Sequence, residues 1–447
     1  MKINQSISGF KRLLVGCAFV IISIHVMGQE GETTTLKKSL KLGNSPTIEL
    51  NLYDLSAVIM KSATNELKIE LDYIADGKEE ELKRLKELME SSVLTGTSGS
   101  NSATVDLTFQ NNFDLEVMGM KWSKVTFKSG NKQSIKLKEF KIKRCKLWLP
   151  AQADISMNAK YSQVNIDYPV NGNFDIDLYD GRLDLKDVSG YLKGDAKYSQ
   201  MKAGNFSEID LDIYECELYA GNTGAVDLNA KYSTIKLGET KSVRLGIYEG
   251  GFSCLKTETA RIENKYASIN FEELGDIQLD AYEGGFEAGK INTMSLSGKY
   301  LELSLGQVGE FRMSEGYENE ISFDKANTII SKDGKYNEFT IGVLTQSFIQ
   351  SGYEDEVEIE SISSDFQKIE LTGKYVEAGL TFVNPPAYVL KGNVQYPDLN
   401  INESRYKVRT KIGDDNRLEF LFEYGNVNDS TPVINIEGYE MDISIEH

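Results

Sequence analysis

Histidine is nearly absent from this sequence of 447 residues. The two histidines are His25, in an apolar segment near the start, and His447, the last residue. Hydrolases of the serine, cysteine and metal-dependent classes use a positioned imidazole as a general base or as a metal ligand. Because residues 26–446 contain no imidazole, the sequence predicts a protein that is not an enzyme and has no catalytic residues.

Cysteine is also scarce: the chain contains Cys17, Cys145, Cys216 and Cys254. Three cysteines remain after Cys17, and an odd number does not indicate a disulfide framework. No pair has the C-x-x-C spacing of a zinc site, and glycine-rich phosphate loops are lacking. We therefore expect Cys145, Cys216 and Cys254 to be small buried apolar side chains rather than reactive or metal-binding thiols, and we expect no cofactor and no metal.

A long apolar run occurs only at the start of the chain, where Lys2, Lys11 and Arg12 precede the apolar residues 13–26. This order is typical of a secretory signal peptide, which we assign to residues 1–28. Cleavage and lipidation at Cys17 is the less favoured alternative, because it would leave only residues 13–16 as the apolar stretch. No later run approaches the roughly 20 residues of a membrane-spanning helix. We expect an exported protein of the periplasm, the outer-membrane surface or the extracellular space, with no transmembrane segment in the mature chain.

Basic side chains are outnumbered by acidic ones. Residues 1–28 hold three of the 49 basic residues and none of the 68 acidic ones, so the remaining chain has 46 basic residues and a net charge of −22. A negative field of this size repels nucleic acid and anionic lipid. We expect no nucleic-acid partner; the partner is an unknown envelope or extracellular polymer or protein.

Residues 29–150 have the pattern of an irregular β region. Alternating apolar residues such as Leu67, Ile69 and Leu71 indicate half-buried strands. Residues 78–91 instead place leucines every three residues among glutamate and lysine, which predicts one amphipathic helix.

Tyrosines recur at a nearly fixed spacing in residues 151–447. They span 214 residues in twelve intervals of about 17.8 residues, and a fixed period of this kind is the signature of a solenoid or an array. The recurring residues are Tyr161, Tyr179, Tyr198, Tyr214, Tyr232, Tyr248, Tyr266, Tyr282, Tyr300, Tyr317, Tyr336, Tyr353 and Tyr375.

Two kinds of unit alternate along this repeat. Lysine precedes the tyrosine in one kind, as in Lys231-Tyr232, and an acid follows it in the other, as in Tyr248-Glu249. The parity of the apolar positions changes at the tyrosine, which predicts two short strands with a bend between them.

Two strands in about 17 residues suit either one rung of a solenoid or one hairpin of an antiparallel meander. We favour the solenoid, because equivalent residues then stack about 4.8 Å apart and the conserved period has a physical cause. In such a stack a lysine would face an acid of the next rung. The predicted fold class is therefore all-β, with a β-solenoid body and C-terminal cap over residues 151–447.

These units, together with the Leu-Trp-Leu-Pro segment at residues 147–150, resemble a family of exported bacterial β-helical proteins known as putative adhesins. The likeness extends from about Thr47 to the C-terminus and depends on the pattern of short rungs. It implies a right-handed β-helix and an extracytoplasmic location, and it transfers no functional residues to this chain.

Acidic residues are abundant, and polysaccharide lyases and hydrolases use pairs of carboxylates. Such enzymes need long loops that wall a cleft, whereas successive tyrosines from Tyr198 to Tyr317 follow one another at short, nearly equal intervals. One group of acids has no recognised calcium spacing and is interpreted as a solvated face. This group consists of Asp175, Asp177, Asp180, Asp184 and Asp187, with Asp414 and Asp415 further along the chain.

One segment, residues 132–146, opposes the overall charge. We interpret it as an edge or exposed strand that lysine protects against aggregation; a docking strip for an anionic polymer or lipid surface is the alternative. Its basic residues are Lys132, Lys136, Lys138, Lys141, Lys143, Arg144 and Lys146, and Glu139 is the single acid among them.

The tyrosine columns also have two interpretations, of which stabilisation of the solenoid is favoured over the binding of sugar rings. The sequence predicts a non-enzymatic, adhesin-like binding or scaffold protein of the cell envelope or cell surface, which acts through a long repetitive β face. The alternative is a polysaccharide-active enzyme, a lyase or hydrolase, on the same fold.

Overall fold

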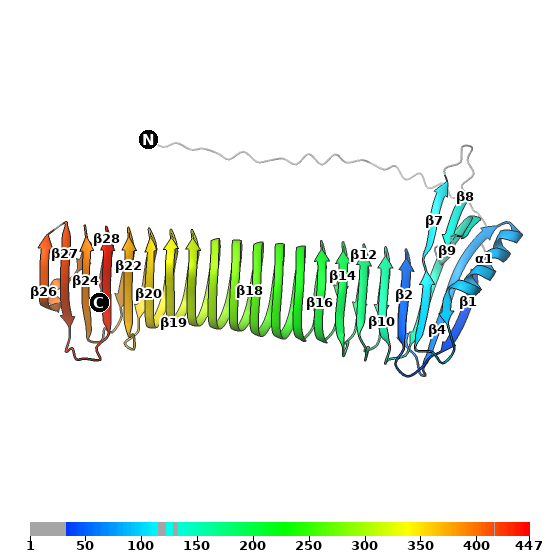
Figure 1. The fold of residues 1–447 in the computed structure, drawn as a ribbon, viewed down its shortest axis with the longest axis horizontal. Helices are drawn as coiled ribbons and strands as arrows, with labels where there is room; N and C mark the ends of the chain where they lie inside the picture. The colour runs from blue at the N-terminus through cyan, green and yellow to red at the C-terminus, as the bar shows by residue number, and fades with distance from the viewer. Residues whose placement is uncertain (1–32, 115–121, 128–132, 415) are drawn as a thin grey trace.

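The computed structural model describes residues 33–114, 122–127, 133–414 and 416–447. The predicted signal peptide, with Cys17 and His25, lies outside these residues. The described chain is all-β with one α-helix, and Figure 1 shows a long row of strands with a splayed group at its N-terminal end. No described helix has the length and apolar character needed to cross a membrane.

The row of strands is a coil in which each strand pairs in parallel with the second strand after it. β10 pairs with β12 in the register Ile155↔Phe174, and β11 pairs with β13 in the register Val164↔Leu183. Two strands therefore make one turn, and β18 (Thr223–Tyr317) runs unbroken through several turns (Figure 1).

The other strands of the coil are short in its first half and of mixed length in its second half. They are β2 (Thr47–Tyr53), β3 (Ser56–Lys61), β10 (Asp154–Lys160), β11 (Gln163–Ile166), β12 (Phe174–Tyr179), β13 (Arg182–Leu185), β14 (Tyr191–Lys197), β15 (Gln200–Lys202), β16 (Phe206–Tyr214), β17 (Glu217–Ala220), β19 (Glu320–Lys335), β20 (Glu338–Tyr353), β21 (Glu356–Ile362), β22 (Lys368–Lys374), β23 (Glu377–Phe382), β24 (Tyr388–Gln395), β25 (Asp398–Ile401), β28 (Val433–Tyr439) and β29 (Asp442–Glu446).

A bend joins the two strands of each turn. Its residue has a positive φ, for example 53° at Tyr232, 51° at Glu249 and 62° at Tyr266. These three bend residues are 17 positions apart, which gives the length of one turn. The predicted bend near each tyrosine is confirmed, and so is the parity change: Leu228 and Ala230 are buried before the bend, Ile235 and Leu237 after it.

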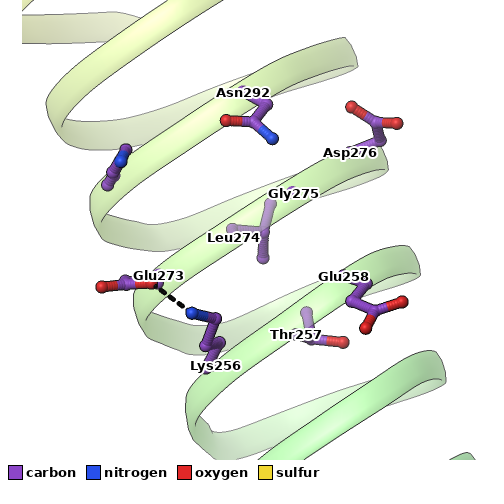
Figure 2. A pocket seen from close by; sticks show the side chains of 9 residues that line it. Lys256, Thr257, Glu258, Glu273, Leu274, Gly275, Asp276 and Asn292 are labelled. Carbon is purple, nitrogen blue, oxygen red and sulfur yellow. Dashed lines mark ion pairs between the residues drawn. The ribbon is translucent and has the colours of Figure 1, made fainter.

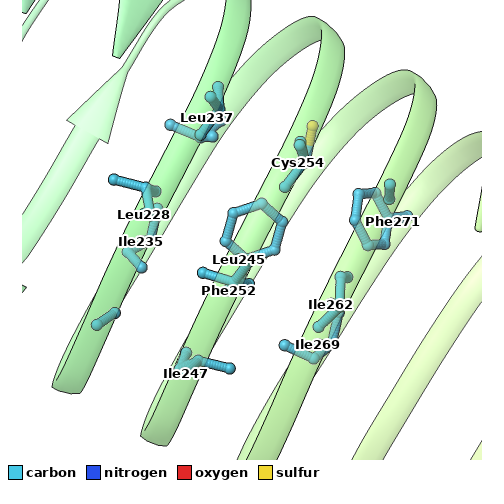
Figure 3. Packing of buried hydrophobic residues seen from close by; sticks show 14 of the residues in the cluster. Leu228, Ile235, Leu237, Leu245, Ile247, Phe252, Cys254, Ile262, Ile269 and Phe271 are labelled. Carbon is cyan, nitrogen blue, oxygen red and sulfur yellow. The ribbon is translucent and has the colours of Figure 1, made fainter. Parts of the chain in front are cut away.

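The core lies inside the coil and consists of columns of apolar side chains, to which each turn contributes one member. Leu228, Leu245 and Ile262 form one column, and each is at most 2% exposed. Figure 3 shows a parallel column, formed by Ile235, Phe252 and Ile269, beside it. Because each side chain stacks on its equivalent in the next turn, the period in the sequence is a direct consequence of core packing.

The coil begins earlier than the sequence predicts. β2 pairs in parallel with β10, and β3 with β11, so residues 47–61 already form one turn. The predicted boundary at residue 150 therefore falls after this first turn. Residues 62–153 form a long insertion between the first turn and the second, which separates equivalent residues in the sequence and conceals the first turn.

The insertion forms most of a twisted, mainly antiparallel group that covers the N-terminal end of the coil (Figure 1). Its single helix, α1 (Glu79–Ser92), matches the predicted helix at residues 78–91 and buries Leu85 and Met89. The strands of this group are β1 (Thr33–Lys41), β4 (Glu66–Gly77), β5 (Leu94–Gly96), β6 (Ser102–Leu107), β7 (Phe109–Asp114), β8 (Trp122–Phe127) and β9 (Gln133–Leu149).

At the other end, the order of strands in space departs from their order in the chain. β28 pairs in parallel with both β22 and β24, so the last described turn, β28–β29, is inserted between two earlier turns. β24 also pairs antiparallel with β27 (Arg417–Tyr424), which pairs with β26 (Tyr406–Asp414) after the short 3-10 helix η1 (Glu403–Arg405). This hairpin covers the end of the coil.

The coil should behave as a rod in solution. Fifteen steps separate Tyr53, the first of the tyrosines that stack along the bends, from Tyr396, the last in space, and at about 4.8 Å per step they span about 72 Å. We expect small-angle scattering to give a distance distribution with a long tail, as for a cylinder. A symmetric distribution, typical of a compact sphere, would contradict this arrangement.

Candidate functional site: the tyrosine ladder

An unbroken row of tyrosines follows the bends along the coil. Neighbouring rings pack edge to face, with centroids 5.4–5.7 Å apart and interplanar angles of 73–83°. We call this row the tyrosine ladder. In spatial order it consists of Tyr53, Tyr161, Tyr179, Tyr198, Tyr214, Tyr232, Tyr248, Tyr266, Tyr282, Tyr300, Tyr317, Tyr336, Tyr353, Tyr375, Tyr439 and Tyr396.

The ladder alternates between two neighbouring backbone positions. At the position before the bend, Tyr179 lies in register with Lys160 on one side and Lys197 on the other. At the bend itself, tyrosine and acid alternate, as at Tyr161 and Asp180. This offset explains why the intervals between successive tyrosines are alternately shorter and longer, although the bends between Tyr198 and Tyr300 recur at equal intervals.

The predicted pairing of ladder lysines with acids of the next rung is wrong. Each lysine lies opposite tyrosines, as in Lys335↔Tyr353, and the acids lie one residue further along the chain. Among the described residues, the ion pairs do not include the ladder lysines. These lysines are Lys160, Lys197, Lys231, Lys265, Lys299, Lys335 and Lys374.

The acids of the ladder act on the tyrosine hydroxyls instead. A hydrogen bond with Glu215, and then burial, raise the pKa of Tyr214 above its ordinary value. The same two causes, with Glu354 as the partner, raise the pKa of Tyr353 to about 12. Tyr214 and Tyr353 therefore keep their hydroxyl protons, and remain hydrogen-bond donors, well above neutral pH.

Tyrosines at the bend are more exposed than those before it. Tyr161, Tyr198 and Tyr232 are 45–46% exposed, whereas Tyr179 and Tyr214 are only partly exposed. The same holds along the ladder, except that Tyr282, which lies before its bend, also reaches 40%. An exposed ring is thus available at every second turn.

Removal of one ladder ring should destabilise the fold. Tyr266 packs against Tyr248 and Tyr282, and each edge-to-face pair contributes about 0.5–1.5 kcal/mol, so Tyr266→Ala should lower the free energy of unfolding by about 1–3 kcal/mol. Tyr266→Asn removes the same ring but tolerates the positive φ better, so it should be more stable than the alanine variant by up to about 1 kcal/mol. Denaturant midpoints would measure both effects. If the alanine variant unfolds at the wild-type midpoint, the ladder is not stabilising.

A second column, made of carboxylates, lies two residues beyond the bend in the C-terminal half of the coil. The parallel register places Glu302 opposite Glu320, and Glu320 opposite Glu338. Like charges directly opposite each other on neighbouring strands destabilise a sheet. Such unfavourable local arrangements are found mostly at functional sites. We call this row the carboxylate column; it consists of Glu302, Glu320, Glu338, Glu356, Glu377, Asp442 and Asp398.

The electrostatic cost of this column is visible at its centre. Burial, followed by the charges of Glu338 and Glu377, raises the pKa of Glu356. Sequence reasoning missed the column, because it used the tyrosine rather than the bend residue as its reference point. Counting two residues from the bend would have found it.

The surface also has shallow hollows. One, of about 320 Å³, contains the ion pair Lys256–Glu273 at 2.8 Å, and Figure 2 shows these two side chains pointing toward each other. Glu258 and Asp276 lie on the other side of this hollow (Figure 2). The hydrogen bond with Lys256 lowers the pKa of Glu273, which does not suit Glu273 for the proton-donating role in glycoside hydrolysis.

A wider hollow, of about 760 Å³, adjoins Tyr219, outside the ladder. Lys202 Nζ and Lys236 Nζ lie 5.9 Å and 5.8 Å from the ring centroid of Tyr219, one on the turn before and one on the turn after. This ring is therefore already occupied by cation–π contacts within the chain.

The acids considered for calcium binding do not converge on one point. Asp184 pairs with Arg182 at 2.8 Å, and Asp187 accepts a hydrogen bond from the backbone N–H of Asn205 at 2.8 Å. Asp175, Asp177 and Asp180 occupy other positions around the same turn. Asp414 accepts a hydrogen bond from the backbone N–H of Asn416 at 2.9 Å. Asp415 lies outside the described residues. Within the described ranges, no three acidic, histidine or cysteine side chains are placed to hold a metal ion.

The basic segment lies on β9, which pairs with β4 along one side. On its other side β9 pairs with β8 up to Leu137 and with β3 from Cys145, so residues 139–144 have no strand partner there in the described part of the chain. This stretch agrees with the predicted edge or exposed strand. Arg144 pairs with Glu70 at 2.7 Å and Asp72 at 2.8 Å, and Lys138 pairs with Asp76 at 3.5 Å. Acids on the neighbouring strand thus match part of this charge. Lys136, Lys141, Lys143 and Lys146 belong to the same strand, and Lys132 lies outside the described residues.

Cys145, Cys216 and Cys254 are buried free thiols, as expected from the sequence. Burial raises the pKa of Cys145 to about 12, and it also raises the pKa values of Cys216 and Cys254. These thiols are therefore unreactive at neutral pH. His447 is packed in the C-terminal cap, where its ring stacks on Tyr424 and its Nε2 lies 2.7 Å from the hydroxyl of Tyr388.

A buried polar chain crosses three turns inside the C-terminal half. Asn319 Nδ2 donates to Asn337 Oδ1 at 2.9 Å, and Asn337 Nδ2 donates to Asp355 Oδ1 at 3.0 Å. Gln350 Nε2 donates to Asp355 Oδ2 at 2.8 Å, while Gln350 Oε1 has no hydrogen-bond partner. Burial raises the pKa of Asp355, so the ionised carboxylate costs stability.

We expect Asp355→Asn to increase stability at neutral pH. The substitution removes a buried charge, and Gln350 can turn its amide so that Oε1 accepts a hydrogen bond from the new Nδ2 group. Because the folded pKa lies above the unfolded one, the wild type should lose stability as pH rises from about 4 through the folded pKa, and the variant should not.

Unfolding free energies at acidic and neutral pH would test this expectation. Asp355→Leu is the matched control: it removes the same charge but leaves the donors of Asn337 and Gln350 unsatisfied, so it should destabilise at both pH values. An asparagine variant that is less stable than wild type at pH 7 would contradict the expectation.

No family model and no curated protein matches this sequence. Among solved structures, a protein of Parabacteroides merdae described as a putative adhesin is found at 12% identity, with 70% of this chain and 96% of that chain covered and a TM-score of 0.21. A second, from Clostridium sporogenes and described as a putative cell adhesion protein, is 10% identical, with 93% and 99% covered and a TM-score of 0.12. These names agree with the resemblance found in the sequence. TM-scores of this size do not establish a shared fold or function.

Proposed function

We propose that this chain is a right-handed β-solenoid, exported behind a signal peptide, that acts as a non-enzymatic binding or scaffold protein of the cell envelope or cell surface. The tyrosine ladder is the observation that carries the proposal. It presents an exposed tyrosine ring at every second turn along the whole coil, and an adhesin-like protein needs an extended surface of this kind.

A repetitive surface favours a repetitive ligand. Each ladder tyrosine offers a similar contact, and contacts that are linked along one polymer combine through their effective concentration. Many weak contacts can then give a high overall affinity without any single deep pocket. A polymer should therefore bind far more tightly than its monomer.

The character of the surface supports binding rather than catalysis. The hollows that flank the coil are open to solvent, and between Tyr161 and Tyr375 successive bends are 17–21 residues apart, which leaves no long loop there to wall a cleft around a scissile bond. Imidazole is limited to His447 in the described residues, and its ring is packed in the cap. A polysaccharide-active enzyme on the same fold remains the alternative that turnover assays would reveal.

Graded weakening of polymer binding is the expected test result. Bend tyrosines are to be replaced by asparagine at one, two and four turns, starting with Tyr232, and binding to envelope polysaccharides measured on a glycan array and by calorimetry. Substitutions are preferable to shortening the chain from its C-terminus, because removal of β28–β29 would open the coil between two other turns. We expect affinity to fall stepwise, with no release of reducing ends from any glycan.

Two results would contradict the proposed function. The first is a single substitution that abolishes all binding, in a variant that loses no more stability than the removal of one ladder ring should cost. This result would reveal one discrete site. Turnover of any glycan by the purified protein would reveal an enzyme.

A further inference from the structure

We infer that the ligand of the tyrosine ladder is a neutral, extended β-1,4-linked polysaccharide that lies along the coil and repeats its contacts every second sugar. This inference rests on the proposed function and specifies its ligand. Three independent properties of the ladder lead to it: its spacing, its hydrogen-bonding neighbours and its charge.

The spacing of exposed rings is two turns rather than one. Lysine-preceded tyrosines occupy the bend, where they are 40–46% exposed from Tyr161 to Tyr375. They alternate with tyrosines that precede a bend and are less exposed, apart from Tyr282 at 40%. Two turns at about 4.8 Å place successive exposed rings about 9.6 Å apart along the rod. Two sugars of an extended β-1,4-linked chain cover a closely similar length, and the half-turn between neighbouring sugars presents the same sugar face at every second unit.

An extended peptide does not match this spacing. Side chains on one face of a β-strand recur every two residues, or about 6.8 Å, so a peptide would soon lose register with rings about 9.6 Å apart. Strand addition along the side of the coil is also precluded, since parallel pairing between turns already uses the backbone donors and acceptors there. A glycan that contacts side chains alone is free of both restrictions.

Each exposed ring has hydrogen-bonding side chains on both sides. Lys265 precedes Tyr266 and Ser268 follows two residues after it; Lys335 precedes Tyr336, and Glu338 follows in the same place. A lysine donor on one side and an oxygen acceptor on the other suit the hydroxyl groups at the rim of a sugar whose apolar face rests on the ring. The acceptors of the eight lysine- or glutamine-preceded turns are Gln163, Gln200, Thr234, Ser268, Glu302, Glu338, Glu377 and Asp398.

The charge of this face favours a neutral ligand. The carboxylate column lies beside the ladder over the C-terminal turns, and the whole chain carries a net charge of −19. Polyanionic glycans would be repelled. Carboxylates are good acceptors for sugar hydroxyls, which gives the costly column a use that a polyanion could not exploit.

Two measurements test the inference on the full mature protein. In the first, calorimetry with cello-oligosaccharides and malto-oligosaccharides of two to eight sugars compares β-1,4 with α-1,4 linkage. We expect affinity for the β-linked series to rise at each even length, and the hexasaccharide to bind at least about tenfold more tightly than the disaccharide. We expect the α-linked series, whose chain coils, not to show this increase.

The second measurement interrupts the ladder in its middle. Tyr232→Asn combined with Tyr266→Asn removes two consecutive exposed rings, so a long chain can engage only the shorter stretches on either side. Affinity for soluble β-1,4-glucomannan should fall at least about tenfold. Tyr219→Asn is the matched control, since Tyr219 lies outside the ladder and should leave affinity unchanged. Denaturant midpoints of all variants confirm that each remains folded.

The outcomes separate this inference from the proposed function. Binding that rises evenly with each sugar, equal binding of the α-linked series, or preference for polygalacturonate or polylysine would overturn the inference while leaving a polymer-binding protein. The inference also falls if the double variant binds glucomannan as wild type does. Failure of the wild type to bind any polysaccharide or envelope fraction would overturn both.

Discussion

One residue in each turn of the coil has a left-handed backbone conformation, and the register of the other residues depends on it. A non-glycine residue with positive φ costs about 1–2 kcal/mol, yet tyrosine, aspartate or glutamate occupies this place from Asp54 to Glu440. The bend fixes where one strand ends and the next begins. Parallel pairing then brings each bend onto the next, and all residues at equal distances from the bend form columns along the rod.

The core and the surface follow from this alignment in the same way. Inside, Leu228, Leu245 and Ile262 stack because each lies four residues before a bend. Outside, the ladder tyrosines stay within 5.7 Å of one another because they occupy only the bend or the place before it. Burial of the core columns and edge-to-face packing of the rings offset the cost of the strained bends.

Much of this arrangement could be predicted from periodicity. The tyrosine spacing predicted the repeat, the change of parity predicted the bend, and the leucine pattern predicted α1 to within one residue. Tyr53 and its turn were missed because the insertion separates them from the turn that they contact. Tyr396 and Tyr439 were missed because β28–β29 lies between turns that precede it in the chain, and a fixed sequence period cannot describe such an inversion. The predicted lysine–acid contacts were wrong because positions were counted from the tyrosine of each turn. That tyrosine lies at the bend in one turn and one residue before the bend in the next, so residues counted from it are not in register.

The zigzag of the ladder also limits how such a coil can change its length. A turn of one kind places lysine before a tyrosine bend, and its neighbours place tyrosine before an acidic bend. Duplication or loss of a single turn would bring two turns of the same kind together, with lysine on lysine and two strained tyrosines in one register. Even the inserted turn obeys the rule: Tyr439, followed by Glu440, separates Tyr375 from Tyr396, both of which lie at the bend. Growth by gene duplication should therefore proceed in units of about 34 residues, two turns at a time, so that coils of this kind would differ in length by even numbers of turns.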